Sequence, residues 1–364
     1  MKKIKIYYDY QIFLHQKFGG VSKYYINLIN NFDSSAEKLI IAPFHKNYYL
    51  DNQVNNVKKL FYFDLKTKNV NFLSNSLNKI YTNFLYNYQT PDIFHFTYFN
   101  QKYYLKKKSS YVMTIYDLIK EKFYKEKFKS EIFNKTKYFN YMDKIICISE
   151  NTKNDLIYYY NLPPELIQVV HLGVSFNKEY TLIANGLPEK PYILFVGDRS
   201  RYKNFKNFIL AYVKSKRLKN DFDVVCFGGG SFESDEINFF KNYGVGQKIK
   251  QINGSDLELN YAYKKARCFV FPSLYEGFGL PLLESMNMDC PVICSDTSCF
   301  PEVVNNAAIK FNPSDVENIM HEIENLVYDE KKILDFITRG RNNIKNFGWK
   351  KCADETLEIY KNIL

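Results

Sequence analysis

The feature that most constrains the fold of this chain is an alternation of short apolar runs with longer segments of helical spacing. Segments such as Tyr24–Ile29 repeat apolar residues at helical spacing between the runs. This alternation is typical of parallel sheets covered by helices on both faces, so we predict an α/β chain. The predicted strands are residues 4–8, 39–42, 93–96, 111–116, 145–148, 169–172, 192–196, 224–227, 269–271 and 292–294.

Two domains are expected from the length of 364 residues, because single cores seldom serve chains of more than about 300 residues. A stretch with Gly186 and Pro188 and little periodicity separates two sets of predicted strands. We therefore predict an N-terminal Rossmann-like domain, a linker, a C-terminal Rossmann-like domain and a last helix that packs back toward the N-terminal domain. Their residues are 1–178, 179–190, 191–346 and 347–364, in that order.

Polar and small residues stand where predicted strands end. In open parallel sheets, ligands bind outside the carboxyl ends of the strands. Two such edges that face each other across a cleft would place a ligand between the domains. The strand-end residues are His95, Asp117, Ser149, Gly197, Gly228 and Ser273. A histidine at such a position is as typical of a hydrogen-bonded core as of a catalytic site.

The clearest candidate for an anion site is the segment FPSLYEGFGLPLLE at residues 271–284. Pro281 marks the first turn of a predicted helix, and the amides of Phe278, Gly279 and Leu280 should point out of its start. Free amides and the helix dipole both favour a phosphate group there. Gly277 and Gly279 would let a ligand approach the main chain closely.

Two carboxylates flank this predicted helix start. Glu276 lies in the loop, and Glu284 is predicted to lie in the first helical turn. A bound diphosphate would repel both, so we expect them to accept hydrogen bonds from sugar hydroxyls. An alternative for Glu284 is that it only balances the helix dipole.

Two further glycine-containing loops precede predicted helices. The loop GDRSRYKN at 197–204 holds Arg199, Arg201 and Lys203, three cations that suit a diphosphate leaving group. An exposed basic loop is the alternative. Gly19 and Gly20 form the second loop, where a pair of glycines also fits a simple turn.

The excess of positive over negative charge is confined to the first half of the chain. Residues 1–180 hold 26 lysines against 15 acidic residues, whereas the remainder holds 24 of each sign. The charge is densest over residues 102–137, where Tyr and Phe interrupt the lysines. An anionic membrane surface, a nucleic acid and a merely solvated face all fit this pattern. No nucleic-acid-binding motif accompanies it, so we expect no nucleic-acid partner.

Cysteine usage predicts a reduced, cytoplasmic protein. Seven cysteines lie mostly inside apolar runs. Cys290, Cys294 and Cys299 match no zinc spacing, and Asp221 and Asp223 precede their strand as turn residues, so we predict no metal site. No apolar run reaches the roughly 18 residues of a transmembrane helix.

Taken in order, these segments resemble the retaining glycosyltransferases of family four, which have the GT-B fold. The likeness spans nearly the whole chain and implies a nucleotide-sugar donor held mainly by the second domain, with the acceptor met by the first. The matching motifs are FGGVSKYYINLI (18–29), DIFHFTYF (92–99), TIYDL (114–118), IICISENTKNDL (145–156), ILFVGDRSRYKNF (193–205), FVFPSLYEGFGLPLLESM (269–286), CPVICSD (290–296) and PEVV (301–304).

Carried over position by position, the resemblance implies a catalytic group, a donor-binding group and an acceptor-side residue. His95 would lie under the donor sugar, Arg199 and Lys203 would stabilise the leaving diphosphate, and Glu276 would hold sugar hydroxyls. Glu284 would bind the ribose, and Asp117 would lie on the acceptor side. The other implied donor-binding residues are Gly19, Gly20, Gly254, Gly277, Phe278, Gly279 and Leu280. The resemblance also implies no divalent metal and no further cofactor, which agrees with the cation-rich loop, since Arg and Lys can neutralise the developing charge.

Three positions depart from the common family pattern. Asp289 stands where relatives have glycine, Asp198 where they often have arginine, and Tyr116 where they often have histidine. Arg199 is expected to take the role of the arginine that Asp198 replaces. These departures bear on acceptor contacts and on fine donor geometry, and leave the predicted fold unchanged.

The stretch from Gly197 to Phe205, taken with His95–Tyr98, most resembles O-antigen and capsule mannosyltransferases. GDP-mannose is therefore the expected donor, with UDP-glucose or a UDP-N-acetylhexosamine as alternatives. The implied acceptor is a lipid-linked or lipopolysaccharide glycan, which would place the basic domain at the inner face of the cytoplasmic membrane. A nucleotide-sugar epimerase of the same architecture and a basic nucleic-acid-binding protein stay open as other classes.

Overall fold

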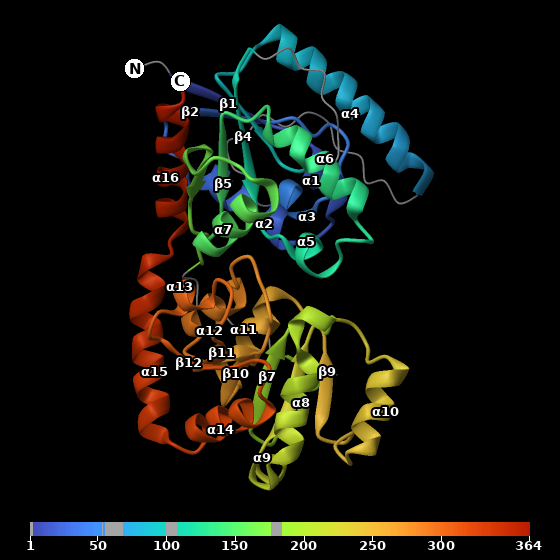
Figure 1. Cartoon of the computed structure of the whole chain (residues 1–364), viewed down its shortest axis with the longest axis vertical. Coiled ribbons are helices and arrows are strands. Elements are labelled where there is room, and N and C mark those ends of the chain that lie inside the picture. The colour runs from blue at the N-terminus through green and yellow to red at the C-terminus, as the bar shows by residue number, and fades with distance from the viewer. Residues whose placement is uncertain (1–2, 53, 55–67, 100–107, 176–183) are drawn as a thin grey trace. The chain divides into compact units, whose positions relative to one another are not determined.

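The computed structural model describes residues 3–52, 54, 68–99, 108–175 and 184–364. It divides into two compact units (Figure 1). The first unit comprises Met1–Gly173 and Trp349–Leu364, and the second comprises Val174–Gly348. Residues 102–107 of the basic stretch and 179–183 of the predicted linker lie outside the described residues.

Each unit is built on a six-stranded parallel sheet, which confirms the predicted α/β class. The first sheet has the order β2-β1-β3-β4-β5-β6. Its strands are β1 (Ile4–Tyr8), β2 (Ala36–Ile40), β3 (Ile93–Phe96), β4 (Ser110–Ile115), β5 (Lys144–Cys147) and β6 (Ile167–Val169). Ile6 is in register with Ile93 and Tyr8 with His95, so the carboxyl ends of β1 and β3 lie at one edge.

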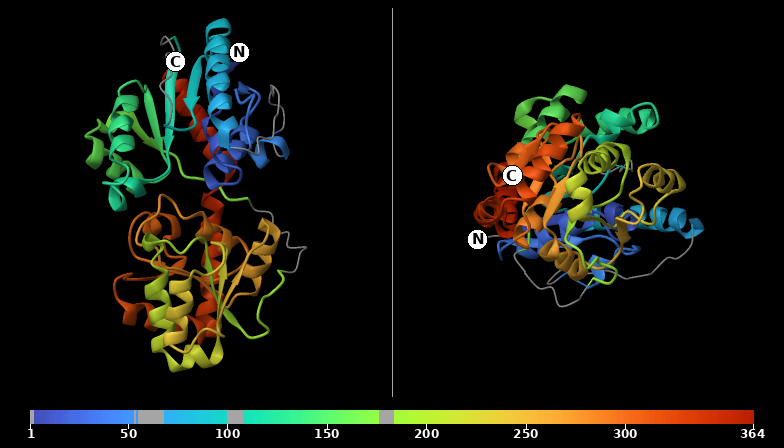
Figure 2. Two further views of the ribbon diagram at one scale, coloured as in Figure 1. Left: turned by 90° about the vertical axis from the view of Figure 1, so that its right-hand side faces the viewer. Right: turned by 90° about the horizontal axis from the view of Figure 1, so that it is seen from below.

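Helices cover both faces of this sheet (Figure 2). They are α1 (Gln11–His15), α2 (Gly20–Asn31), α3 (Tyr48–Asn52), α4 (Lys68–Tyr88), α5 (Ile119–Phe123), α6 (Lys129–Phe139), α7 (Glu150–Tyr160), the 3₁₀ turn η1 (Pro164–Leu166) and α16 (Trp349–Asn362). The bounds of α7 follow from local chemistry, because the Ser149 side chain caps its first turn and Asn161 ends it in the left-handed conformation (φ 49°).

The last helix of the chain, α16, belongs to the first unit and packs on α2. The hydroxyl groups of Tyr8 and Tyr360 lie 3.1 Å apart, and Ser110 Oγ donates to the Ile363 carbonyl at 3.0 Å. A Cβ on Gly173 would come within 2.4 Å of the Trp349 main chain, so only glycine allows this close approach.

The second sheet has the order β12-β11-β10-β7-β8-β9. Its strands are β7 (Tyr192–Val196), β8 (Asp223–Phe227), β9 (Ile249–Ile252), β10 (Cys268–Phe271), β11 (Val292–Ser295) and β12 (Ala308–Phe311). All five side chains of β7 are buried, as expected for an inner strand with helices on both sides.

The helices of the second unit complete its two outer layers. They are the 3₁₀ turn η2 (Arg201–Lys203), α8 (Phe205–Lys214), α9 (Lys216–Asp221), α10 (Ser234–Asn242), α11 (Asp256–Lys265), α12 (Leu280–Asn287), α13 (Phe300–Val304), α14 (Val316–Val327), α15 (Glu330–Asn343) and the 3₁₀ turn η3 (Ile344–Asn346). Phe195, Phe205 and Phe208 form a ring cluster beneath α8, with ring centroids 4.9 to 6.4 Å apart.

Sequence and structure differ mainly at the edge strands. The predictions missed β9 and β12, and displaced β2 and β6 by two or more residues. All four are the outermost strands of their sheets. Each exposes part of its side chains, so its residues lack the continuous apolar run by which the inner strands are recognised.

Candidate functional site

The loops after β7 and β10 bring together two residues that the sequence singled out. Lys203 Nζ lies 2.6 Å from Glu276 Oε1, although the two are 73 positions apart. Lys203 ends the turn η2, and Asn204 (φ 56°) then turns the chain into α8. Both side chains are largely buried, with 13% and 12% of their surfaces exposed. The carboxyl edge of the second sheet therefore holds a fixed cation beside a fixed carboxylate.

Hydrogen bonds hold Glu276 in place from two sides. Ser273 Oγ donates to Glu276 Oε1 at 2.8 Å. Ser298 Oγ accepts from the Glu276 N–H at 3.2 Å and donates to its carbonyl at 2.8 Å. Because the main chain and the carboxylate are both held, the charge of Glu276 stays directed at Lys203. Lys203 Nζ also lies 5.4 Å from the centre of the Phe271 ring.

The start of α12 presents unpaired main-chain donors. Gly279 has φ 89°, a left-handed conformation that suits glycine, and Pro281 lies in the first turn of the helix, as predicted. Within the described part of the chain, the N–H groups of Gly279 and Leu280 have no hydrogen-bond acceptor. An anion at this helix start would satisfy them, and the helix dipole would favour it.

Glu284 lies further along α12 than predicted. The helix begins at Leu280, so Glu284 is its fifth residue and opens the second turn instead of lying in the first. Its carboxylate is half-buried, and its charge adds to the effect of burial in raising the pKa of Tyr263. The first turn of α12 contains no acidic residue, so the role of Glu284 as a dipole partner is weakened.

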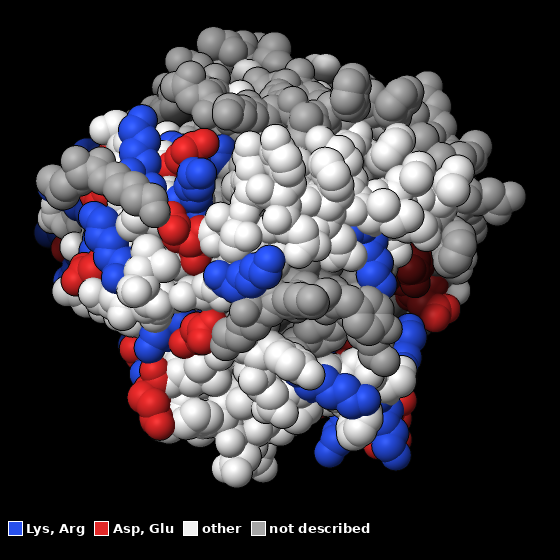
Figure 3. Space-filling view, turned by 90° about the horizontal axis from the view of Figure 1, so that it is seen from above, with Lys and Arg blue, Asp and Glu red and all other residues white. Residues whose placement is uncertain are grey.

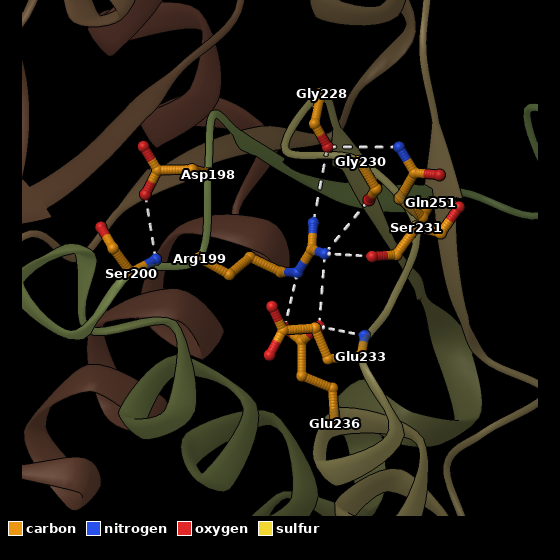
Figure 4. Close-up of polar contacts among 9 residues, drawn as sticks. All are labelled: Asp198, Arg199, Ser200, Gly228, Gly230, Ser231, Glu233, Glu236 and Gln251. Carbon is orange, nitrogen blue, oxygen red and sulfur yellow. Dashed lines mark hydrogen bonds and ion pairs between the residues drawn. The ribbon is translucent and has the colours of Figure 1, made fainter.

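Arg199 is enclosed by its own loop and by the loop after β8 (Figure 4). Its Nε lies 2.6 Å from Glu236 Oε1, and its Nη2 lies 3.3 Å from Glu236 Oε2. The same guanidinium donates to the carbonyls of Gly228 at 3.5 Å, Gly230 at 3.1 Å and Ser231 at 3.0 Å. Only 5% of the Arg199 side chain is exposed. In this structure Arg199 therefore orders a loop, and its contact with a diphosphate stays a prediction.

Three successive glycines, Gly228 to Gly230, form the loop that contacts this guanidinium, and Gly229 makes room for it. All three adopt left-handed angles, with φ between 73° and 83°. A Cβ on Gly229 would lie 2.6 Å from the Gly197 carbonyl oxygen and 2.8 Å from Arg199 Nη1. The loop after β8 can therefore pack against the loop after β7 only without a side chain at this position.

Glu236 was missed by the sequence reasoning, although a signal was present. Glu233 and Glu236 are three residues apart before an apolar run, and they form a capping box at the start of α10. The Glu236 carboxylate accepts from the Glu233 N–H at 2.8 Å and also binds Arg199. The capping-box spacing was readable in the sequence, whereas the pairing with Arg199 required the fold.

His95 lies inside the first unit, with no exposed surface. Its Nδ1 lies 2.5 Å from the Tyr360 hydroxyl, and its Nε2 lies 2.9 Å from Thr114 Oγ1. Burial lowers its pKa to about 3, so the ring is neutral near pH 7. The structure places His95 as a hydrogen-bonded core histidine, and gives no support to a direct contact with a donor sugar.

Acidic residues occupy the carboxyl edge of the first sheet. Asp9 follows β1 and accepts hydrogen bonds from the Thr97 N–H at 3.1 Å, from Thr97 Oγ1 and from Gln11 Nε2 at 2.7 Å. Burial raises the pKa values of Asp9 and Asp117. Asp117 follows β4 and accepts from the Ile119 N–H at 3.0 Å. Asp9 was not among the predicted site residues, although it closes the first apolar run of the chain.

The remaining predicted glycines lie at helix starts. Gly19 caps α2, and a Cβ there would lie 2.3 Å from Gln16 Oε1, whereas a Cβ on Gly20 would meet no atom within 4 Å. Gly254 lies just before α11, where a Cβ would come within 2.9 Å of the Glu258 side chain. Gly20 therefore leaves open space at the start of α2, whereas a side chain at Gly19 or Gly254 would have to displace the side chain of Gln16 or Glu258. Gly277 lies between Glu276 and Phe278 in the loop before α12.

The departures from the family pattern have local structural reasons. Asp289 has φ 59°, a conformation that favours glycine, and its carboxylate pairs with Arg341 at 2.6 Å and Lys264 at 3.2 Å. Asp198 Oδ1 accepts from the Ser200 N–H at 2.9 Å, which makes it a turn residue. Tyr116 packs its ring edge-on against Tyr24 and Tyr25.

The seven cysteines are all buried and form no disulfide. Burial raises the pKa values of Cys290, Cys294 and Cys299. Within the described ranges, no group of three or more His, Cys, Asp or Glu side chains is arranged to hold a metal ion. The described helices also include none with both the length and the apolar character needed to cross a membrane.

Family models match both halves of the chain. Residues 18–178 match the model described as Glycosyltransferase Family 4, and residues 181–343 match the model described as Glycosyl transferases group 1. The chain belongs to glycosyltransferase family four.

Curated relatives of this glycosyltransferase include O-antigen enzymes. The chain is 29% identical over 228 residues to O-antigen chain mannosyltransferase B of Escherichia coli, covering 60% of each chain. It is 28% identical over 207 residues to O-antigen chain mannosyltransferase RfbU of Salmonella typhimurium, covering 56% of this chain and 55% of the relative. The matched region therefore spans little more than half the length of these relatives.

Solved structures show that this glycosyltransferase has the GT-B fold. Sucrose-phosphate synthase from Thermosynechococcus elongatus superposes with a TM-score of 0.75 at 15% identity, covering 100% of this chain and 99% of that one. HepE of Anabaena, solved in complex with UDP-glucose, gives a TM-score of 0.72 at 14% identity, covering 98% and 99%.

Proposed function

We propose that the chain transfers a hexose, with mannose from GDP-mannose as the leading candidate, to a glycan acceptor in the synthesis of a cell-surface polysaccharide or lipopolysaccharide. The observation that carries the proposal is the Lys203–Glu276 pair at the same sheet edge as the amides of Gly279 and Leu280, which have no acceptor among the described residues. The similarity to O-antigen chain mannosyltransferases supports the choice of mannose and of a glycan acceptor.

The chemistry needed for this transfer is charge neutralisation at the leaving diphosphate. Lys203 supplies a full positive charge, and the start of α12 supplies two amide donors and the positive end of a helix dipole. In a largely buried setting such fixed donors stabilise a developing negative charge more strongly than water does. We propose that these groups do so without a divalent metal.

Glu276 has a different task, because a carboxylate would repel the diphosphate. It holds Lys203 in position through Oε1, while a sugar hydroxyl can donate to the carboxylate. We propose that the departing phosphate takes the proton of the acceptor hydroxyl on the same face of the sugar. The anomeric configuration would then be retained.

The donor is tested by thermal shift with GDP-mannose, UDP-glucose and a UDP-N-acetylhexosamine. A ligand at about 100 times its Kd adds about 2.7 kcal/mol to the stability of the state that binds it. For a unit of this size that corresponds to roughly 5–10 °C in Tm. We expect GDP-mannose to give this shift, and UDP-glucose is included because HepE was solved with it. Stabilisation by no sugar nucleotide at all would contradict the proposal.

Turnover is tested on Lys203→Met and Glu276→Gln, with Lys214→Met as the matched control. Lys214 lies on the nearby helix α8 in an exposed pair with Glu317, so its loss should change little. Each site variant should lower kcat by about a hundredfold, the usual effect of removing one electrostatic contact to a transition state. Near-normal turnover in both would refute the assigned roles. Conversion of the donor without any acceptor would favour an epimerase.

A further inference from the structure

Helix α4 of the first unit packs Tyr86, with Leu85 and Tyr81, against the core and leaves a second set of large apolar side chains exposed. Five large apolar residues on this helix are 39% to 72% exposed. Together they form the α4 stripe, which consists of Leu73, Leu77, Ile80, Phe84 and Tyr88. Figures 1 and 2 show α4 at the outside of its unit. A helix whose outer face met only water would carry polar side chains on that face.

The stripe is continuous along one side of the helix. At 100° per residue, its five positions fall within an arc of about 80°, and 15 residues of helix extend about 22 Å. The opposite side of α4 carries Ser74, Asn78 and Thr82, all of them buried. Asn78 Nδ2 donates to the Phe44 carbonyl at 2.8 Å, and its Oδ1 accepts from the Phe44 N–H at 3.0 Å. These hydrogen bonds and the packing of Tyr86 against the core attach α4 to its unit, and the α4 stripe stays on the outward side.

The net charge of the first unit indicates which kind of partner the α4 stripe can bind. Residues 68–88 contain Lys68 and Lys79 and no acidic residue. The whole first unit has 28 lysines against 17 acidic residues, a net charge of +11, whereas the second unit is neutral. In the view of Figure 3, basic and acidic side chains lie side by side near uncharged areas, so the excess of lysines is a property of the unit as a whole. A partner must therefore be apolar where it meets the stripe and negatively charged around it.

A second copy of the chain could offer an apolar surface to the stripe, but it would not bring negative charge. It would bring another unit of charge +11 against the first, and like charges at an interface oppose association. The stripe exposes on the order of 500 Å², less than the roughly 800 Å² per partner of a stable interface. An anionic bilayer meets both conditions, because its acyl region takes apolar side chains and its headgroups attract lysines.

We propose that α4 lies in the surface of an anionic membrane, with its stripe among the acyl chains and the lysines of the first unit against the headgroups. This inference does not depend on which sugar is transferred. It identifies the element that would hold the enzyme at a lipid-linked acceptor.

The test uses the full chain and vesicles of phosphatidylcholine with or without about 30% phosphatidylglycerol. The stripe variant is Leu77→Ser/Ile80→Ser/Phe84→Ser. The control variant is Tyr158→Ser, whose side chain is 81% exposed on α7 of the same unit. We expect the unaltered chain and the control to sediment with anionic vesicles, and the stripe variant to bind at least about tenfold more weakly. Raising the salt from about 0.1 M to about 1 M should weaken all binding by screening the lysines.

A second measurement does not depend on the folding of a triple variant. In Ile80→Trp the new indole joins one buried tryptophan, Trp349. Its fluorescence should shift to the blue with anionic vesicles and be quenched by lipids brominated on their acyl chains. Donor-induced stabilisation should be the same in the stripe variant as in the unaltered chain, which separates this test from that of the transferase activity.

Three results would overturn the proposal. One is sedimentation of the stripe variant equal to that of the unaltered chain. Another is a new indole in Ile80→Trp that the brominated lipids leave unquenched, as expected if another segment of this chain covers the stripe. The third is a dimer in solution that the stripe variant loses, which would make a second copy the partner.

Discussion

Replacing Arg199 by methionine removes a guanidinium that joins two loops at the carboxyl edge of the second sheet. Methionine keeps much of the length of the side chain and loses all of its donors. The lost contacts are the two-point pair with Glu236 and the bonds to three carbonyls between Gly228 and Ser231. The carboxylate of Glu236 and these carbonyls then lose their donor, and either form hydrogen bonds with water or change position.

The expected cost is about 3 kcal/mol of unfolding free energy. Breaking a fully buried ion pair costs about 3–5 kcal/mol, and bonds to a charged group contribute about 1.5–3 kcal/mol. Arg199 is 5% exposed, but Glu236 is 21% exposed, so water can partly replace the lost partner and the lower end applies. For the second unit, Val174–Gly348, this equals a fall in Tm of roughly 6–12 °C.

The assay must report on the second unit, because the single tryptophan, Trp349, belongs to the first. Hydrogen exchange by mass spectrometry on peptides covering 228–236 gives a local readout, and thermal unfolding gives the global one. Arg339→Met is the matched control, since Arg339 forms an exposed pair with Asp335 one helical turn away. Its loss should cost less than about 1 kcal/mol. Glu236→Gln completes a double-mutant cycle with Arg199→Met.

Two results would refute this reasoning. Arg199→Met with unfolding free energy and exchange at 228–231 unchanged would show that the guanidinium does not hold the loop. A large fall in kcat for Arg199→Lys, with that exchange unchanged, would instead indicate a direct contact with the diphosphate. If Arg199 positions the loop, hydrogen exchange at 228–231 and the KM for the donor should change together in Arg199→Met and in Arg199→Lys.

Two further predictions follow from buried groups. His95 binds a proton in the unfolded state below pH 6.5 and in the folded state only near pH 3, so unfolding takes up a proton in this window and stability falls as the pH falls. The loss is about 1.4 kcal/mol per pH unit below 6.5. Urea unfolding followed by Trp349 fluorescence at pH 7 and pH 5 should show it, and His95→Asn should lack this contribution; equal slopes in both proteins would contradict the assignment. Gly229→Ala should destabilise the second unit more than Gly230→Ala, because both have φ near 75° but only the first would collide with the Gly197 carbonyl. Equal Tm values for the two alanine variants would show that the collision is relieved at no cost.

The local sequence pattern was enough to predict the class of fold and several residues of the candidate site. The inner strands, such as β7 and β10, are continuous apolar runs because helices cover both of their faces. Lys203, Glu276 and the glycines before α12 stood out because cations, carboxylates and glycines at a strand-to-helix turn are typical of a site that binds an anionic ligand. The apolar runs and the strand-to-helix turns each span only a few consecutive residues, so both can be recognised in the sequence.

Tertiary structure alone decided which of these residues meet. Glu276 pairs with Lys203 because β10 lies beside β7 in the sheet, and no period in the sequence encodes that order. The same holds for Arg199 with Glu236, and for His95 with Tyr360, which is 265 residues away. The outward stripe of α4 is the reverse case, since a helical repeat shows that one side is apolar but not which side faces the core. The buried side depends on packing, because the free energy of burying a helix face is set by its contacts with elements that are distant in the sequence.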